Sequence, residues 1–297
     1  MTTAVATERE PFAELEQAVQ FDPASGSAWG GLGRAYQDAD AHELARAAFE
    51  QAVRFCPDAP MHWFGLGRAR LEAGDLQGAL AAARRAVELA PDGPGARLLL
   101  ARAFGQLGLI RQAILHLEEA QRLDPQWPLP LADLGWAQQA VGDFGAAGEA
   151  FETALRLDPD QPALWSPLGQ CLLERGRPAD AVHVLETAVF GRPKDGVAWT
   201  RLGCAYFETG RHAEAARAFT RAFEHGEDGP WAWYWAGQNA AALGDGEALD
   251  RARRELKERD AVLLRELETR VEAIVAKESS ANPEEGPCHS PCVPTAG

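Results

Sequence analysis

The chain has 297 residues, a net charge of −15 and a sequence pI near 4.9. This acidic balance argues against a nucleic-acid-binding surface, because phosphate contacts need clustered cations. No stretch approaches the eighteen or more apolar residues of a membrane span, and the N-terminal residues lack the pattern of a secretory signal. Five scattered cysteines, an odd number, are typical of reduced thiols. The composition therefore predicts a cytoplasmic protein with neither nucleic acid nor membrane as a partner.

The first elements along the chain are a lone helix and then a helical pair. Residues 1–7 are expected to be disordered, and residues 8–25 contain one helix that ends at Pro23. In residues 26–59, apolar side chains recur twice at the i, i+3 and i+7 spacing of a helix face. The first set is Trp29, Leu32 and Tyr36, and the second is Ala45, Phe49 and Ala52. This segment predicts two helices joined by a turn.

The same pattern returns every 34 residues without insertion. Proline marks the period six times, at positions 23, 57, 91, 125, 159 and 193. Tryptophan, leucine and alanine columns keep the same phase, with a small residue after each leucine. The complete units are 26–59, 60–93, 94–127, 128–161, 162–195 and 196–229. A periodic pattern of this length predicts a stack of helical pairs rather than a single globular core.

Glycine, aspartate and proline explain how each unit turns. A glycine stands between the two helices of most units, where a left-handed residue is favoured. These glycines are Gly74, Gly108, Gly142, Gly176, Gly210 and Gly244. The aspartates that follow, Asp75, Asp143 and Asp245, are predicted to cap the second helix. Prolines at 60, 94, 128, 162 and 230 are expected at the first position of the next helix, where a missing N–H is tolerated.

This repeat pattern resembles the tetratricopeptide repeat (TPR). The residues that carry the resemblance are, in order, tryptophan, Leu-Gly, tyrosine, glycine, alanine, phenylalanine, alanine and proline. The resemblance covers roughly residues 8–263 and implies an all-α TPR solenoid, a right-handed superhelix of helix–turn–helix repeats over residues 26–246. The segment 8–25 then corresponds to a half-repeat that caps the N-terminal end.

The pattern weakens at the C-terminal end. A seventh unit at 230–263 keeps Trp233, Gly237 and Gly244 but is degenerate afterwards. Residues 247–278 lack glycine and proline and predict one long amphipathic capping helix that overlaps this unit, with a bend at Asp260 as an alternative. Residues 279–297 are rich in proline and small residues and are expected to be disordered.

The resemblance also implies where a partner would bind. In TPR proteins, positions 2, 5, 6, 9, 12 and 13 of a unit commonly face a concave groove. Position 9 carries Arg34, Arg68 and Arg102 in the first three units, a ladder suited to acidic groups. The alternative is that Arg34 with Asp38 and Arg68 with Glu72 form ordinary pairs four residues apart. The family's carboxylate clamp, with lysine at position 5 and asparagine at position 9, is absent.

Aromatic residues gather on the groove positions towards the other end. Trp231, Tyr234 and Trp235 fall at positions 2, 5 and 6 of the seventh unit, and Trp231 and Trp235 share one face. They are either a hot spot for a partner or a surface that the terminal helix covers. The full set of candidate partner-binding residues is Arg34, Arg68, Arg102, Trp136, Gln170, Arg201, Phe207, Trp231, Tyr234 and Trp235.

Motifs for catalysis or for cofactors are not found. The histidines occupy different repeat positions, and no phosphate-binding glycine loop or HExxH pattern occurs. Cys288, His289 and Cys292 could contribute to a metal site but lie in the expected tail, so neither a metal nor a cofactor is predicted. Cys171 and Cys204 are interpreted as small packing residues rather than nucleophiles.

The sequence therefore predicts a non-catalytic scaffold that binds a peptide or a partner helix in the groove. A ligand that spanned both ends would carry acidic residues followed by bulky apolar ones. Two alternatives stay open. The chain could self-assemble through its C-terminal helix, or it could be an accessory subunit of a kinase, peptidase or glycosyltransferase system.

Overall fold

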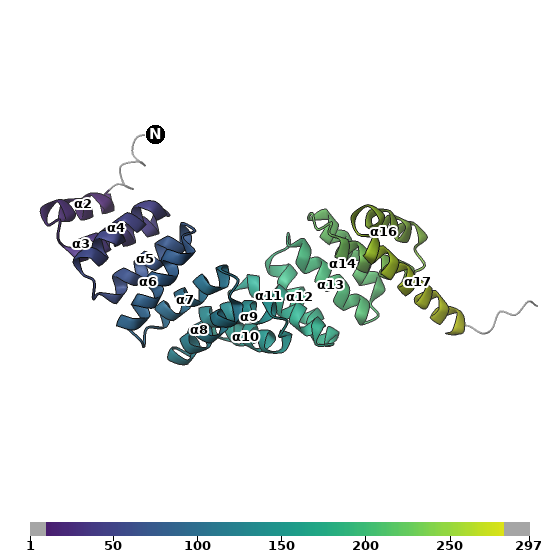
Figure 1. The fold of residues 1–297 in the computed structure, drawn as a ribbon. Helices are drawn as coiled ribbons and strands as arrows, with labels where there is room; N and C mark the ends of the chain where they lie inside the picture. Colours follow the sequence, from purple (N-terminus) through teal and green to yellow (C-terminus); the bar gives the residue numbers. More distant parts are fainter. Residues whose placement is uncertain (1–9, 282–297) are drawn as a thin grey trace, which may run out of the picture. The chain divides into compact units, whose positions relative to one another are not determined.

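The computed structural model describes residues 10–281. These residues form sixteen helices, α2 to α17, and the described part of the chain contains no strand (Figure 1). The chain divides into two compact units, residues 1–161 and 162–297.

The first unit opens with one helix, α2 (Glu10–Phe21), followed by four helical pairs. The pairs are α3 (Gly26–Asp38) with α4 (His42–Phe55), α5 (Pro60–Glu72) with α6 (Leu76–Leu89), α7 (Pro94–Gln106) with α8 (Ile110–Leu123), and α9 (Pro128–Ala140) with α10 (Phe144–Leu157). Each first helix packs on the second helix of its own pair, and α4, α6 and α8 also pack on the first helix of the next pair. The contacts therefore run from one pair to its neighbour.

The second unit continues the pattern and ends with an additional helix. Its elements are α11 (Pro162–Glu174), α12 (Pro178–Gly191), α13 (Gly196–Glu208), α14 (His212–Glu224), α15 (Pro230–Ala242), α16 (Gly246–Arg259) and α17 (Ala261–Ala281). As predicted, each of the prolines at 60, 94, 128, 162 and 230 is the first residue of its helix.

The turns have the geometry that their glycines indicate. All six predicted turn glycines adopt a left-handed backbone, with φ between 67° and 81°. The side chains of Asp75, Asp143 and Asp245 accept hydrogen bonds from backbone N–H groups three residues later. The predicted caps are therefore confirmed, and the boundary between the two helices of a pair follows from local chemistry.

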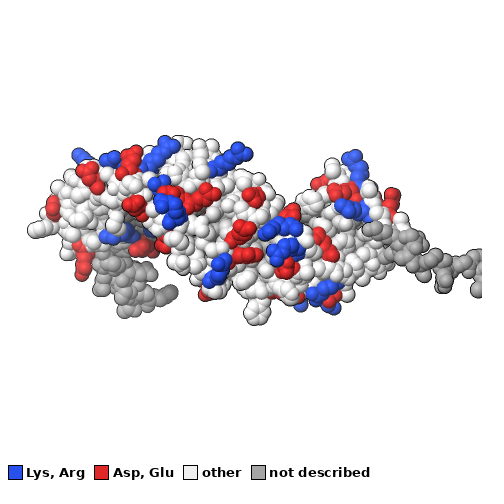
Figure 2. Space-filling view, turned by 90° about the horizontal axis from the view of Figure 1, so that it is seen from below, with Lys and Arg blue, Asp and Glu red and all other residues white. Residues whose placement is uncertain are grey.

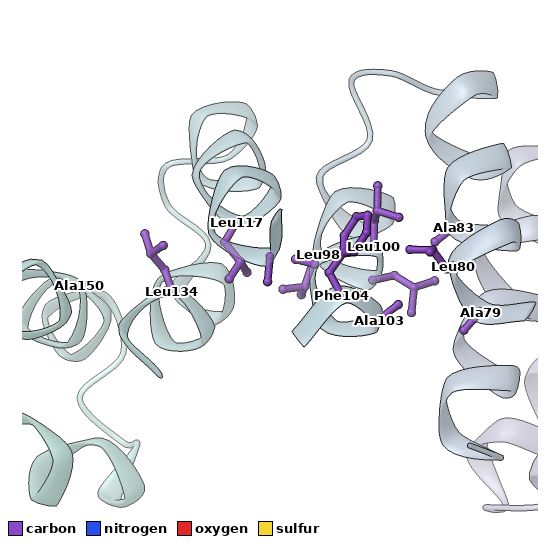
Figure 3. Close-up of a cluster of buried hydrophobic side chains, with 13 residues drawn as sticks. Ala79, Leu80, Ala83, Leu98, Leu100, Ala103, Phe104, Leu117, Leu134 and Ala150 are labelled. Atoms are coloured by element: carbon purple, nitrogen blue, oxygen red, sulfur yellow. The ribbon is translucent and has the colours of Figure 1, made fainter. Parts of the chain in front are cut away.

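Small residues let the two helices of a pair approach closely. A Cβ added to Gly135 would lie 2.6 Å from the Phe151 ring, and Gly203 has the same relation to Phe219. A larger residue would force the helices apart, since real side chains do not pack at that distance. Around α7, Leu98, Leu100 and Phe104 lie between alanines and a leucine of α6 on one side and leucines of α8 and α9 on the other (Figure 3).

The predicted long helix over residues 247–278 is wrong. The chain forms two helices, α16 and α17, and Asp260 between them has an extended backbone with φ −155° and ψ 95°. The Asp260 carboxylate accepts hydrogen bonds from the N–H groups of Val262 and Leu263, which caps α17. The break lets α17 fold back onto α15 and bury Leu267 completely. The bend at Asp260 was thus the better alternative, and α17 extends to Ala281.

Candidate functional site

A hollow of about 780 Å³ lies in the first unit, lined mainly by α5, α7 and α9, the first helices of three successive pairs. Of the predicted groove residues, Arg68, Arg102 and Trp136 all line it. We call this feature the α7 hollow. Its volume falls in the range of about 300–1,000 Å³ that is common for binding sites in proteins.

The hollow exists because α7 carries two glycines on this side. A Cβ at Gly105 would meet nothing within 4 Å, and a Cβ at Gly95 would only touch the Phe64 ring at 3.5 Å. Neighbouring first helices carry larger residues at the equivalent positions, including Leu71 and Leu129, and these form walls around the gap. These two positions of α7 therefore add no side chain to the hollow, whose apolar lining includes Leu98 and Ala101 of the same helix.

Charges at the edge of the hollow are paired. Arg68 Nε lies 3.6 Å from Glu72 Oε1, so the predicted pair four residues apart is present. Arg102 Nε donates to Asp133 Oδ2 of α9 at 2.5 Å. Local spacing could not predict this second pair, because its partners are 31 residues apart and meet only when two repeats stack.

Arg34 does not belong to this group. It is exposed, it is not among the residues that line the α7 hollow, and within residues 10–281 it has no carboxylate at ion-pair distance, Asp38 included. The α7 hollow thus includes two of the three predicted arginines. On the face shown in Figure 2, acidic and basic side chains alternate and do not form a large region of one sign.

Trp136 provides an accessible aromatic surface in the α7 hollow. Its side chain is 46% exposed, and its ring meets Phe151 of the same pair edge to face, with centroids 5.4 Å apart. Phe64 and Leu129 contribute apolar surface nearby. The sequence analysis did not predict Phe64 or Leu129 as site residues. Two glycines on the groove side of one helix are, however, a sequence pattern that indicates a hollow there.

In the second unit, Arg201 and Gln170 are brought together. The Arg201 guanidinium donates to Gln170 Oε1 at 2.7 Å and to Ser166 Oγ at 2.6 Å, which connects α13 to α11. Burial lowers the pKa of Arg201, and both hydrogen-bond partners are neutral. This contact stabilises the stacking of the two repeats.

The aromatic residues of the second unit form an edge-to-face chain. Phe207 meets Trp235, Trp235 meets Tyr234, and Tyr234 meets Trp231, with ring centroids 5.5–5.7 Å apart. Trp231 is 59% exposed and Trp235 is half-buried. The expectation that Tyr234 faces an open groove is wrong, because the residue is buried and its hydroxyl donates to Glu266 of α17 at 2.9 Å. The terminal helix covers this part of the aromatic cluster.

Neither Cys171 nor Cys204 has the properties of a nucleophile. Burial raises the pKa of Cys171 to about 11 and also raises that of Cys204, so neither thiol ionises near neutral pH. Within the described residues, no group of three or more histidine, cysteine, aspartate or glutamate side chains is placed to hold a metal ion. Cys288, His289 and Cys292 lie outside the described residues.

Family comparison agrees with this architecture. Models described as tetratricopeptide repeat match residues 13–60, 54–94, 64–128, 139–202 and 196–228. The chain therefore belongs to the tetratricopeptide-repeat family, and its fold is an all-α TPR solenoid. No curated protein matches the sequence. None of the described helices is both long enough and apolar enough to cross a membrane.

Several solved structures share the fold. PilF of Pseudomonas aeruginosa is 17% identical with a TM-score of 0.60, over 71% of this chain and 96% of that chain. A chain of the APC/C hetero-tetramer Cut9–Hcn1 is 20% identical with a TM-score of 0.61, over 82% of this chain and 46% of that one. YrrB, described as a TPR protein with an unusual peptide-binding site, is 21% identical with a TM-score of 0.57, over 64% of this chain and all of its own. At these identities the likeness concerns the fold.

Proposed function

We propose that this protein is a non-catalytic scaffold that binds a peptide or a partner helix in the α7 hollow. The observation that carries the proposal is the gap left by Gly95 and Gly105 between apolar walls. Exposed apolar surface of this kind is typical of protein interaction sites. The peptide-binding site named for YrrB supports a similar use of the fold.

The contacts around the hollow favour an apolar anchor over an acidic one. Arg68 and Arg102 already lie beside Glu72 and Asp133, so their positive charges are partly compensated before any acidic ligand arrives. A bulky apolar side chain, in contrast, would cover Phe64 and Trp136 without displacing a charge. We therefore expect affinity to come mainly from a large aliphatic or aromatic residue, with charges at the rim setting orientation.

Gly105 allows the hollow to be filled without disturbing the fold. We expect Gly105→Leu to weaken binding at least tenfold, because the new side chain takes the ligand's place, and Gly105→Ala to change affinity less than about threefold. Both substitutions should raise stability slightly, by about 0.5–1 kcal/mol, because glycine is unfavourable inside a helix. The ligands would be peptides selected on the wild type from a random display library, and the dissociation constants would come from fluorescence polarisation with the synthetic peptides.

Selected peptides that bind Gly105→Leu as tightly as the wild type would contradict the proposal. Trp231→Ala is the second variant in this experiment, because Trp231 is exposed in the other unit. Peptides that lose affinity only with Trp231→Ala would move the binding site to the aromatic cluster of the second unit.

The self-assembly alternative depended on a free apolar face of the C-terminal helix. Leu263, Leu267 and Val271 of α17 are buried in one cluster with residues of α15 and α16 of the same chain. That face is thus already covered, which favours the scaffold over assembly through this helix.

A further inference from the structure

A second hollow, of about 470 Å³, lies in the other unit between α14, α15 and α16. Most of its lining is apolar and includes Phe219, Phe223 and Trp233. We call it the α15 hollow. It shares no residue with the α7 hollow and contains none of the residues predicted for the groove.

The α15 hollow lies where a regular contact of the repeat is missing. Tryptophan recurs at the repeat position of Trp233. In three other pairs, its indole N–H donates to the carbonyl oxygen of the proline six residues earlier, at 2.7–2.9 Å. These bonds are Trp29 to Pro23, Trp63 to Pro57 and Trp199 to Pro193. Before Trp233 the equivalent residue is Glu227, which follows a left-handed turn at Gly226. The Trp233 indole nitrogen is buried and has no acceptor among the described residues.

Arg251 also lines the α15 hollow, and it is exposed to solvent. Its guanidinium carbon lies 5.2 Å from the centroid of the Trp233 ring, and Phe223 stacks on that ring at 4.0 Å. No carboxylate in the described part of the chain lies within ion-pair distance of Arg251. The two acidic side chains at the rim are engaged elsewhere, since Glu224 pairs with Arg221 at 3.0 Å and Asp245 caps α16.

The hollow therefore combines an apolar lining, which includes Trp233, with one exposed cation that has no carboxylate partner among the described residues. A ligand that complements both features has an apolar body and a single negative charge. A doubly charged phosphate is disfavoured relative to a carboxylate, because Glu224 and Asp245 in the lining repel two negative charges more strongly than one and only one arginine is present.

We propose that the α15 hollow binds a small aliphatic carboxylate, with its carboxylate on Arg251 and its apolar body against Phe219, Phe223 and Trp233. Two sources have this chemistry. One is the C-terminal residue of a peptide with a branched aliphatic side chain, and the other is a free short-chain carboxylic acid. A site of this size and charge gives a small molecule a dissociation constant on the order of 1 mM.

The test uses the full ¹⁵N-labelled chain and three probes. N-acetyl-leucine represents a peptide C-terminus, 4-methylpentanoate represents a free acid, and N-acetyl-leucinamide has no charge. The indole N–H resonance of Trp233, assigned by its loss in Trp233→Phe, is followed during titration to about 20 mM of each probe. At least one carboxylate should shift this resonance with saturation, and the neutral amide should bind at least fivefold more weakly.

Three variants decide whether the α15 hollow is responsible. Arg251→Gln should weaken binding of the carboxylate at least fivefold, and Ala248→Leu should weaken it similarly by filling the hollow. Arg254→Gln, which removes an exposed arginine of the same helix that does not line the hollow, should bind like the wild type. Thermal melts of all three variants should remain near that of the wild type.

Each outcome has a clear meaning. Saturable binding of N-acetyl-leucine alone identifies a peptide C-terminus as the ligand class, and binding of 4-methylpentanoate alone identifies a free acid. The proposal is overturned by equal binding of the neutral amide, by undiminished binding to Arg251→Gln, or by no shift with any probe. None of these outcomes depends on peptide binding in the α7 hollow.

Discussion

Asp40 has the left-handed backbone conformation that glycine has at the corresponding position of the other repeats. Its φ of 54° makes it the one non-glycine residue with positive φ within residues 10–281. The equivalent position of the next pair is Gly74, with φ 80° and no atom near its missing Cβ. Aspartate tolerates the left-handed region better than most residues, but it still has a steric penalty that glycine lacks.

Asp40→Gly should therefore stabilise the protein. We expect a gain of about 0.5–1 kcal/mol in the free energy of unfolding, since the relieved strain exceeds the added flexibility of the unfolded chain. The reverse comparison is Gly74→Ala, which should destabilise by about 1 kcal/mol. Urea denaturation monitored by circular dichroism measures both, and a loss of stability in Asp40→Gly would show that the Asp40 side chain makes a compensating contact.

At the scale of elements, the C-terminal end shows how a solenoid is closed. α17 packs more on α15 than on α16. In the regular repeats, the helix that follows a pair packs mainly on the second helix of that pair. Gly237 of α15 permits this approach, because a Cβ there would lie 2.8 Å from Leu267 Cδ2. The docked helix covers Tyr234 and part of the aromatic cluster, so it acts as a cap for the last apolar face.

Leu267 and Gly237 should therefore be energetically coupled. Leu267→Ala should destabilise the protein by about 3 kcal/mol, because it opens a cavity at a fully buried position. Gly237→Ala should destabilise by about 1–3 kcal/mol through overpacking, and by clearly less in the Leu267→Ala background. A double-mutant cycle in urea measures the coupling. Strict additivity of the two changes would mean that α17 is not docked on α15 as described.

The three tyrosines of the chain all make the same kind of hydrogen bond between helices. Each hydroxyl donates to a glutamate of another helix, in the pairs Tyr36–Glu16, Tyr206–Glu186 and Tyr234–Glu266. The first two pairs are five repeats apart at identical repeat positions, so one inter-helix contact recurs in both compact units. Burial raises the pKa of each tyrosine, and the hydrogen bond to glutamate raises it further, to about 12 for Tyr206.

These pKa values predict how the protein responds to alkaline pH. A tyrosine whose pKa is higher in the folded state contributes stability below pH 10, and this contribution is lost as the pH rises from about 10 to 12. Absorbance at 295 nm should show no tyrosine with an ordinary pKa in the folded protein, and three near pH 10 in urea. Tyr206→Phe should make the alkaline loss of stability less steep. A folded-state titration centred on pH 10 would contradict the hydrogen-bonded arrangement.

Local chemistry made most of the fold predictable. The glycine, aspartate and proline positions of each unit predict the turns, the caps and the helix starts, and the structure confirms them. The same reasoning failed at residues 247–278, where no glycine or proline marks the end of α16. There a single aspartate, Asp260, caps the next helix instead. The burial of one face of α17 then stabilises the arrangement of two separate helices.

The candidate site was predictable only in part. Position within the repeat placed Arg68, Arg102 and Trp136 on one side of the stack, and all three line the α7 hollow. The pairing of Arg102 with Asp133 and the burial of Tyr234 under α17 could not be predicted, because both depend on residues from different repeats.

The sequence by itself determined the helical pairs, their boundaries and their order. Each repeat makes the same contacts with its nearest neighbours, so the residues that make them recur at a fixed period along the chain. Only the tertiary structure decided which groove residues are free. Whether an arginine is paired, whether a glycine opens a hollow and where the last helix docks all depend on side chains that meet between helices. Those meetings are set by packing distances of a few ångströms, which the spacing of residues along a chain does not encode.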